Sequence, residues 1–267
     1  MDMDEASLLL FDIGNTNIKV GLASGRAVLA DYSLRADAGR TADDWGLTLL
    51  ELLRHAHVRP ESLRACVASS VAPRLDPTMR EMCRRYLHKE LLFAPEDLPV
   101  PLLNRYERPA EVGADRLVGA YAARKLVPEA QSLICVDFGT ALTFDCVTEN
   151  AYLGGLIFPG VHTAAGALAG STAKLPEVSL EVDGLEPVPG RSTATSIRHG
   201  ILFGYAALVE GLCARLSRSL APPVAVLATG GFAGEMQRIT GCFSRVVPGL
   251  LLEGLRLVYL ENTPDFR

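Results

Sequence analysis

The sequence predicts an α/β protein made of two copies of one domain, which face each other across a central cleft. Each half opens with a short apolar strand that ends in an aspartate, at 8–12 and 133–137. A glycine-bearing turn and a returning strand follow in both halves, and then a third strand and a helical pattern. The repeated unit, which starts at 8–12 and again at 133–137, is too long to be a solenoid repeat. We therefore expect a duplicated domain, with residues 1–116 and 117–267 as the two copies.

The first aspartate motif predicts a strand, a turn and a second strand. Residues 8–11 are apolar, Gly14 permits turn angles closed to other side chains, and apolar residues alternate with Lys19 and Gly21 on the return. Dinucleotide fingerprints and P-loops need a helix after the turn, so both are excluded. Turn amides can cradle phosphate oxygens, and Asp12 can hold Mg²⁺ through water. An ordinary hairpin with polar turn residues is the alternative.

The remaining elements follow from periodicity and from turn residues. In the first half we expect strands at 28–34, 63–69 and 90–93, helices from Thr41 and over 76–87, and a proline-bearing crossing loop at 95–109. A helix then opens at Gly113 and ends before Pro128. In the second half we expect strands at 133–136, 142–147, 151–158 and 224–228, and helices at 161–168, 193–219, 234–239 and 250–260.

Composition narrows the class of protein. The chain has 267 residues, 49% of them hydrophobic, and can bury a sizeable core. Its net charge of -5 argues against nucleic acid as a partner. The six cysteines form no CxxC pair, which indicates reduced thiols and a cytoplasmic protein. The start of the chain lacks the basic region of a signal peptide, and no uninterrupted apolar run reaches membrane-spanning length, so no membrane partner is expected.

The motifs together resemble a known superfamily. The aspartate turns and a late Thr229-Gly-Gly are similar to those of the actin, hexokinase and heat-shock ATPase superfamily, whose domains are ribonuclease H-like. Within it, the chain resembles type III pantothenate kinases. The matching stretches, in family order, begin at Asp12 (DIGNTN), Ser69 (SSVAP), Gly113 (GADR), Asp137 (DFGTA), Gly154 (GG), Phe158 (FPG), Thr172 (TAKLP), Gly190 (GRST), Thr229 (TGG) and Leu252 (LEGL).

The resemblance implies ATP-dependent phosphorylation of pantothenate to 4'-phosphopantothenate, the first step of coenzyme A biosynthesis, by a cytoplasmic homodimer. It implies that Asp115 acts on the substrate hydroxyl, that Asp137 binds K⁺ or NH₄⁺, and that Mg²⁺ accompanies ATP. The implied ATP-binding residues are Asp12, Ile13, Gly14, Asn15, Thr16, Asn17, Ile18, Lys19 and Thr140. The implied pantothenate-binding residues are Tyr106, Gly113, Ala114, Asp115, Arg116 and Thr193.

The chemistry of these residue types fits those roles. Asp115 opens a predicted helix, whose dipole would keep it ionised and able to accept a proton; the alternative is a helix N-cap. The guanidinium of Arg116 matches a substrate carboxylate, or else forms a surface pair with an aspartate. Asp137 follows a buried strand, where a cation or turn amides can compensate its charge. Gly230 and Gly231 allow close approach of adenosine, or simply form a tight turn.

Two other functions remain open on the sequence: a catalytically inactive regulatory or accessory protein of the same fold, and a kinase for another hydroxy acid or sugar. The joint presence of Asp12, Asp115, Arg116 and Asp137 disfavours the first. Three positions depart from the family pattern: Val247-Pro248-Gly249, Phe158 and the variable Lys19. None of them lies in the central motifs.

Overall fold

A computed structural model describes residues 3–172 and 174–264. The chain divides into two compact units. Unit 1 holds the residues up to Leu102, Glu107–Ala122 and the residues from Gly249 onward, and unit 2 holds Leu103–Tyr106 and Ala123–Pro248. This division differs from the expected ranges 1–116 and 117–267, because the C-terminal helix packs on the first sheet and a four-residue segment joins the second unit.

The sheet of unit 1 has the strand order β3-β2-β1-β4-β5. Its strands are β1 (Leu8–Ile13), β2 (Asn17–Ala23), β3 (Val28–Arg35), β4 (Ala65–Ser70) and β5 (Leu91–Phe93). β1, β2 and β3 pair antiparallel, whereas β1, β4 and β5 pair parallel. The predicted strand-turn-strand motif is therefore confirmed, and β1 lies at the centre of the sheet.

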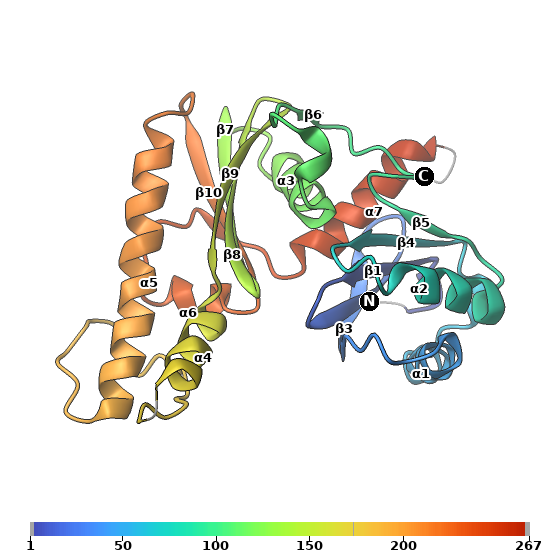
Figure 1. Cartoon of the computed structure of the whole chain (residues 1–267). Coiled ribbons are helices and arrows are strands. Elements are labelled where there is room, and N and C mark those ends of the chain that lie inside the picture. Colours follow the sequence, from blue (N-terminus) through green and yellow to red (C-terminus); the bar gives the residue numbers. More distant parts are fainter. Residues whose placement is uncertain (1–2, 173, 265–267) are drawn as a thin grey trace. The chain divides into compact units, whose positions relative to one another are not determined.

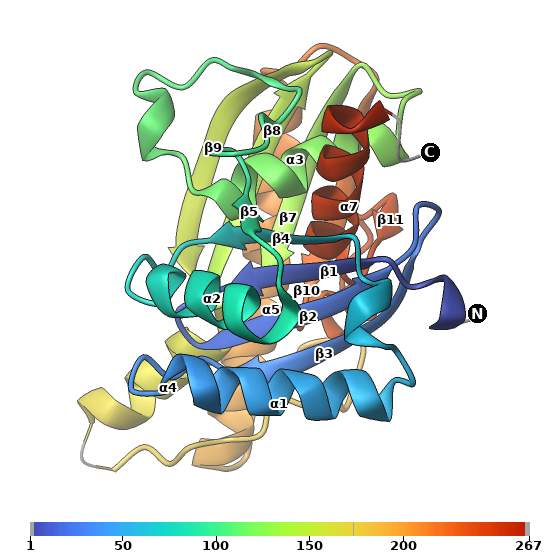
Figure 2. The ribbon, with the colours of Figure 1, turned by 90° about the vertical axis from the view of Figure 1, so that its right-hand side faces the viewer.

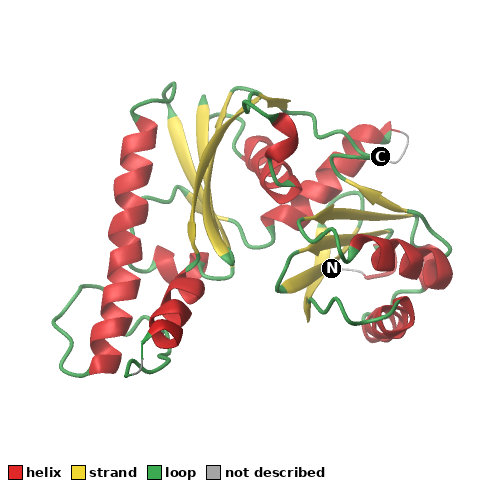
Figure 3. Ribbon diagram, in the orientation of Figure 1, coloured by secondary structure: helices red, strands yellow, loops and turns green. Residues whose placement is uncertain are grey.

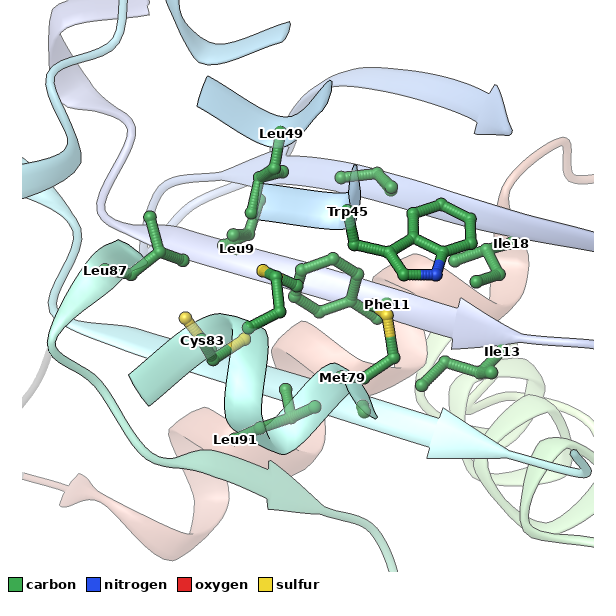
Figure 4. Packing of buried hydrophobic residues seen from close by; sticks show 14 of the residues in the cluster. Leu9, Phe11, Ile13, Ile18, Trp45, Leu49, Met79, Cys83, Leu87 and Leu91 are labelled. Atoms are coloured by element: carbon green, nitrogen blue, oxygen red, sulfur yellow. The ribbon is translucent and has the colours of Figure 1, made fainter. Parts of the chain in front are cut away.

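Alternation along β1 directs its side chains to two covered faces. Phe11 and Ile13 pack into a core with Trp45 of α1 (Ala42–His55) and Met79 of α2 (Asp76–Met82) (Figures 2 and 4). The opposite face contacts α7 (Leu250–Asn262), where the Leu252 side chain lies 3.1 Å from the place of a Cβ on Gly21. Asp12 alternates with Phe11 and so belongs to the α7 face.

The sheet of unit 2 repeats the same plan. Its order is β11-β10-β7-β8-β9-β6, from β6 (Leu103–Asn104), β7 (Ser132–Phe138), β8 (Ala141–Thr148), β9 (Ala151–Pro159), β10 (Val224–Gly230) and β11 (Arg245–Val246). β7, β8 and β9 pair antiparallel and β7, β10 and β11 parallel, which matches β1 to β5 strand for strand. The predicted duplication is confirmed, and β6 is an addition at the edge of β9.

Three helices belong to unit 2: α4 (Val161–Ser171), α5 (Thr193–Ser217) and α6 (Ala233–Gln237), and α5 runs along the sheet (Figures 1 and 3). By length and composition alone, α5 could cross a membrane, and no other described helix could. Leu202, Tyr205, Val209 and Cys213 of α5 nevertheless pack with residues of β7, β8 and β10 in one core. This contact packs one face of α5 against the sheet of unit 2.

Several local expectations need correction. The helix expected over 76–87 is α2 followed by a π-helical turn (Cys83–Leu87), which ends at His88 with φ 54°. The crossing loop expected at 95–109 contains β6, and β11 was not expected at all. Short 3₁₀ turns lie at Met3–Glu5, Pro60–Ser62 and Pro109–Glu111. Strands of two residues carry too little periodicity to be detected in sequence.

Candidate active site

The hairpin between β1 and β2 exposes three polar residues at its tip. The Gly14 amide donates to the Asn17 carbonyl at 3.0 Å, and a Cβ on Gly14 would lie 2.9 Å from that oxygen. Asn15, Thr16 and Asn17 are exposed, whereas Ile13 and Ile18 below them are buried and paired in register. The hairpin therefore offers polar atoms at its tip and stands on a rigid base.

Asp12 lies at the carboxyl end of β1 between two polar neighbours. Lys19 pairs with it on β2 and Ser69 pairs with it on β4, so all three side chains belong to one face of the sheet. The Ser69 side chain is fully buried, and its hydroxyl has no hydrogen-bond partner among the described residues. Its counterpart in unit 2, Thr229, donates its hydroxyl to the Val247 carbonyl at 2.8 Å.

Gly113, two residues before Asp115, and the hairpin strand β1 border the same residue, Val71. The Val71 amide donates to the Ile13 carbonyl at 3.0 Å. A Cβ on Gly113 would lie 3.5 Å from Val71 Cγ1 and 2.5 Å from Asp115 Oδ1. The absence of a side chain at Gly113 thus leaves room for the Asp115 carboxylate. Unit 1 therefore brings the hairpin strand and Gly113, which sequence reasoning predicts to bind ATP and substrate, to the residue that follows β4.

Asp115 is the second residue of α3 (Ala114–Leu126), so the N-cap alternative is wrong. Its Oδ1 accepts the Arg116 amide at 2.8 Å. Burial raises the pKa of the Asp115 carboxyl, and this effect outweighs the backbone hydrogen bond and the charge of Arg116, which lower the pKa. Desolvation therefore makes Asp115 a stronger base than an ordinary aspartate. Its ionisation, expected from the helix dipole, stays a prediction.

Asp137 of unit 2 holds the position that Asp12 holds in unit 1. It lies near the end of β7, in register with Thr229 on β10. Gly230 has φ 91°, and a Cβ there would lie 2.4 Å from Asp137 Oδ1 and 2.6 Å from the Phe138 backbone. The first glycine of the Thr229-Gly-Gly motif thus makes room for the Asp137 carboxylate.

The turn after Asp137 is hydrogen-bonded to Gly160, the N-cap residue of α4. Thr140 accepts at its carbonyl from the Gly160 amide at 3.0 Å and from the Thr163 hydroxyl at 2.7 Å. A Cβ on Gly160 would lie only 2.3 Å from the Gly139 carbonyl oxygen, so no larger residue fits. The Phe158-Pro-Gly stretch therefore fixes the turn that carries Thr140.

The other two predicted substrate residues also belong to unit 2. Tyr106 follows β6, half-buried, and its ring packs against Tyr152 with centroids 6.4 Å apart. Thr193 is the exposed first residue of α5, after the N-cap Ser192, whose hydroxyl accepts the Thr195 amide. Together with Gly190 and Arg191, Ser192 and Thr193 border a depression at this helix start.

Comparisons with known proteins identify the family. The family model described as type III pantothenate kinase matches residues 8–215. The chain belongs to the type III pantothenate kinase family. The type III pantothenate kinase of Desulfovibrio desulfuricans is 61% identical over 262 residues, which cover 98% of this chain and 100% of the relative. That of Nitratidesulfovibrio vulgaris (strain Miyazaki F) is 61% identical over 254 residues, covering 95% and 97%.

A solved structure supports the fold. Component A of (R)-2-hydroxyglutaryl-CoA dehydratase from Acidaminococcus fermentans superposes with a TM-score of 0.56 at 16% identity, covering 97% of this chain and 98% of that one. At this identity the likeness shows the fold alone. It agrees with the duplicated strand order, and the predicted actin-like ATPase fold is confirmed.

In this member of the type III pantothenate kinase family, some predicted site residues belong to unit 1 and the others to unit 2. Asp12–Lys19 and Gly113–Arg116 belong to unit 1, whereas Tyr106, Asp137, Thr140 and Thr193 belong to unit 2. Sequence reasoning left Ser69 unassigned and missed Asp145, a buried carboxylate in β8. The signal for Asp145 was a single charged residue inside the apolar run from Leu142 to Val147.

Proposed function

We propose that the protein transfers the γ-phosphoryl group of ATP to the primary hydroxyl of pantothenate and forms 4'-phosphopantothenate. The observation that carries this proposal is the Asp115 carboxylate, which burial makes more basic. It meets the Cβ position of Gly113, which borders Val71, the residue whose amide is hydrogen-bonded to Ile13 below the hairpin turn. The D. desulfuricans relative, 61% identical over almost the whole chain, is named a type III pantothenate kinase.

Phosphoryl transfer depends on positioning and on charge neutralisation. In the proposed reaction Asp12–Lys19 hold the ATP phosphates, and Asp115 accepts the hydroxyl proton as the substrate oxygen attacks phosphorus. A carboxylate with a raised pKa is better matched to neutral pH for this task. Mg²⁺, when bound with ATP, neutralises phosphate charge, and Asp12 would hold it through water.

The acid end of pantothenate needs a cationic partner. Arg116 follows Asp115 directly, and its positive charge acts on that carboxylate. Its guanidinium can bind the substrate carboxylate through two parallel hydrogen bonds. We assign Arg116 to the acid end, Asp115 to the alcohol, and Gly113, Ala114, Tyr106 and Thr193 to the remaining contacts.

Asp137 is proposed to bind K⁺ or NH₄⁺. The described residues hold no group of three or more histidine, cysteine, aspartate or glutamate side chains arranged for a metal ion. A large monovalent cation suits one carboxylate combined with backbone carbonyls, since oxygen atoms are the ligands that hard cations prefer. The carbonyl oxygen of Gly139 in the adjoining turn provides that chemistry, and Gly230 leaves room for the Asp137 carboxylate.

Assembly and location are inferred as well. Four large apolar side chains of β9 are exposed: Leu153, Leu156, Ile157 and Phe158. An apolar strand of this kind favours an interface, and we propose a homodimer that uses it. The six cysteines are free thiols, which fits a cytoplasmic enzyme. The net charge of -5 disfavours nucleic acid, and the proposal needs no membrane.

The test is identification of the product. Purified protein with ATP, Mg²⁺, K⁺ and pantothenate is expected to yield pantothenate carrying one additional phosphoryl group on its primary hydroxyl, seen by mass spectrometry and phosphorus NMR. A panel of other hydroxy acids and sugars serves as the control. Preferential phosphorylation of one of those compounds would replace pantothenate as the substrate.

A further inference from the structure

A buried carboxylate lies in β8 outside the motifs assigned above. Asp145 is only 3% exposed. Its Oδ1 accepts the Tyr152 hydroxyl at 2.8 Å, and its Oδ2 accepts the Thr143 hydroxyl at 3.2 Å. A carboxylate removed from water is costly unless hydrogen bonds compensate it. Burying the Asp145 carboxylate therefore costs free energy that its two hydrogen bonds offset. In the bond with Tyr152, the tyrosine hydroxyl is the donor and the carboxylate is the acceptor.

Tyr152 connects Asp145 to a third side chain, Tyr106. It lies in β9, its side chain is fully buried, and its hydroxyl is anchored by Asp145. Its ring packs against the ring of Tyr106, with centroids 6.4 Å apart and planes at 40°. A tilted aromatic contact at this distance is favourable and depends on orientation.

Tyr106 is restrained from a second side by Gly154. A Cβ on Gly154 would lie 3.2 Å from both Cδ2 and Cε2 of the Tyr106 ring, and φ of Gly154 is 109°. The backbone is fixed too: the Tyr106 amide donates to Asn104 Oδ1 at 3.0 Å, and the Arg105 amide donates to the Tyr152 carbonyl at 2.9 Å. Since Tyr106 is only half-buried, part of it remains available to a ligand.

We propose that Asp145 and Tyr152 are positioning residues that hold the Tyr106 ring in the orientation that binds pantothenate. This inference rests on the proposed function, in which Tyr106 contacts the substrate. Asp145 and Tyr152 act through Tyr106 and touch neither ATP nor the reacting atoms. Their removal should therefore weaken pantothenate binding and leave the ATP step unchanged.

The experiment compares Tyr152→Phe with the wild type in steady-state kinetics. Loss of the hydroxyl frees the Tyr152 ring from Asp145, and the KM for pantothenate should rise about tenfold, the effect of one hydrogen bond to a charged group. kcat and the KM for ATP should change less than about twofold. Asp145→Asn should move the same constant in the same direction if it folds.

The matched control is Tyr86→Phe. Tyr86 also donates its hydroxyl to an aspartate, Asp43 at 2.6 Å, but this exposed pair lies between α1 and the π-helical turn of unit 1. Tyr86→Phe should leave kcat, the KM for pantothenate and the KM for ATP unchanged. An unaltered pantothenate KM in Tyr152→Phe, or an equal fall in stability and in every constant, would overturn the positioning role alone. Wild-type turnover that ignores pantothenate would overturn the proposed function and this inference together.

Discussion

Three aspartates lie in different surroundings, and these surroundings separate their proposed tasks. Asp12 has a lysine and a buried serine beside it in register. Asp137 lies against a glycine backbone. Burial raises the pKa of the Asp115 carboxyl. The same side chain can therefore assist metal and phosphate binding at one site and accept a proton at another.

The first prediction concerns Asp115. Asp115→Asn removes the proton acceptor, so kcat should fall by roughly 10²–10⁴, the usual contribution of a general base. In the wild type, kcat should fall as pH drops through the raised pKa, at higher pH than for an ordinary aspartate near about 3.9. Kinetics of both proteins across pH check this, and near-normal turnover by a folded variant would contradict it.

Stability provides the control for that variant. Because the folded-state pKa of Asp115 is raised, its contribution to stability is fully present below the unfolded-state pKa and is lost as pH rises through the folded-state pKa. Asp115→Asn should therefore unfold at the same or higher temperature than the wild type at pH 7. The difference should disappear in acid, where both side chains are neutral. A lower Tm for the variant at pH 7 would show that Asp115 supports the fold.

At the scale of elements, each sheet presents its functional turn after a central strand. The amides of Gly14 and Gly139 both donate back to the start of the returning strand, at 3.0 and 3.1 Å. In both units the adjacent parallel strand, β4 or β10, places a hydroxyl residue in register with the aspartate. The two turns thus occupy equivalent positions in the two copies of the duplicated domain.

The second prediction concerns the end of β10. Gly230→Ala should destabilise the protein by about 2 kcal/mol or more, because φ is positive and the new Cβ would meet Asp137 Oδ1 at 2.4 Å. Displacement of Asp137 should also lower kcat/KM for ATP, by about 100-fold for a shift near 1 Å. Gly241→Ala is the matched control, since a Cβ there meets nothing within 4 Å and Gly241 has no proposed role in binding. Equal behaviour of the two variants would contradict this account.

Most helices and strands could be predicted from the sequence, but two short strands that depend on pairing with other strands could not. Long apolar runs such as 8–11 and the Thr41 cap, which closes a capping box with Asp44, carry their own local signal. β6 and β11 exist because they pair with β9 and β10, and that information is not local. The raised pKa of Asp115 likewise depends on its burial in the folded chain, which a helix-dipole argument could not include.

At the scale of the whole molecule, the duplication was predictable and the division into units was not. Repeated motifs at Asp12 and Asp137 indicated two related halves, and the matching strand orders confirm them. No motif indicated that α7 would cover the first sheet, because an apolar helix at the end of a chain fits either sheet equally well. Contacts such as Leu252 with Gly21 decide its place.

The third prediction concerns assembly. Ile157 is 64% exposed on β9 among three other exposed apolar side chains. If this strand forms the homodimer interface, Ile157→Glu should shift the protein from dimer to monomer in sedimentation velocity, because a buried, unpaired carboxylate opposes association. Leu47→Glu is the control, since Leu47 is equally exposed on α1. A wild type that sediments as a monomer would contradict the proposal.

The most direct test of the central claim is ADP release by the purified wild-type protein with ATP and Mg²⁺, measured with and without pantothenate, in potassium and in sodium buffers. The account predicts rapid release only when pantothenate and potassium are both present, and almost none from Asp115→Asn. Release at the same rate without pantothenate would contradict the claim that this fold and its Asp115 carboxylate serve a pantothenate kinase.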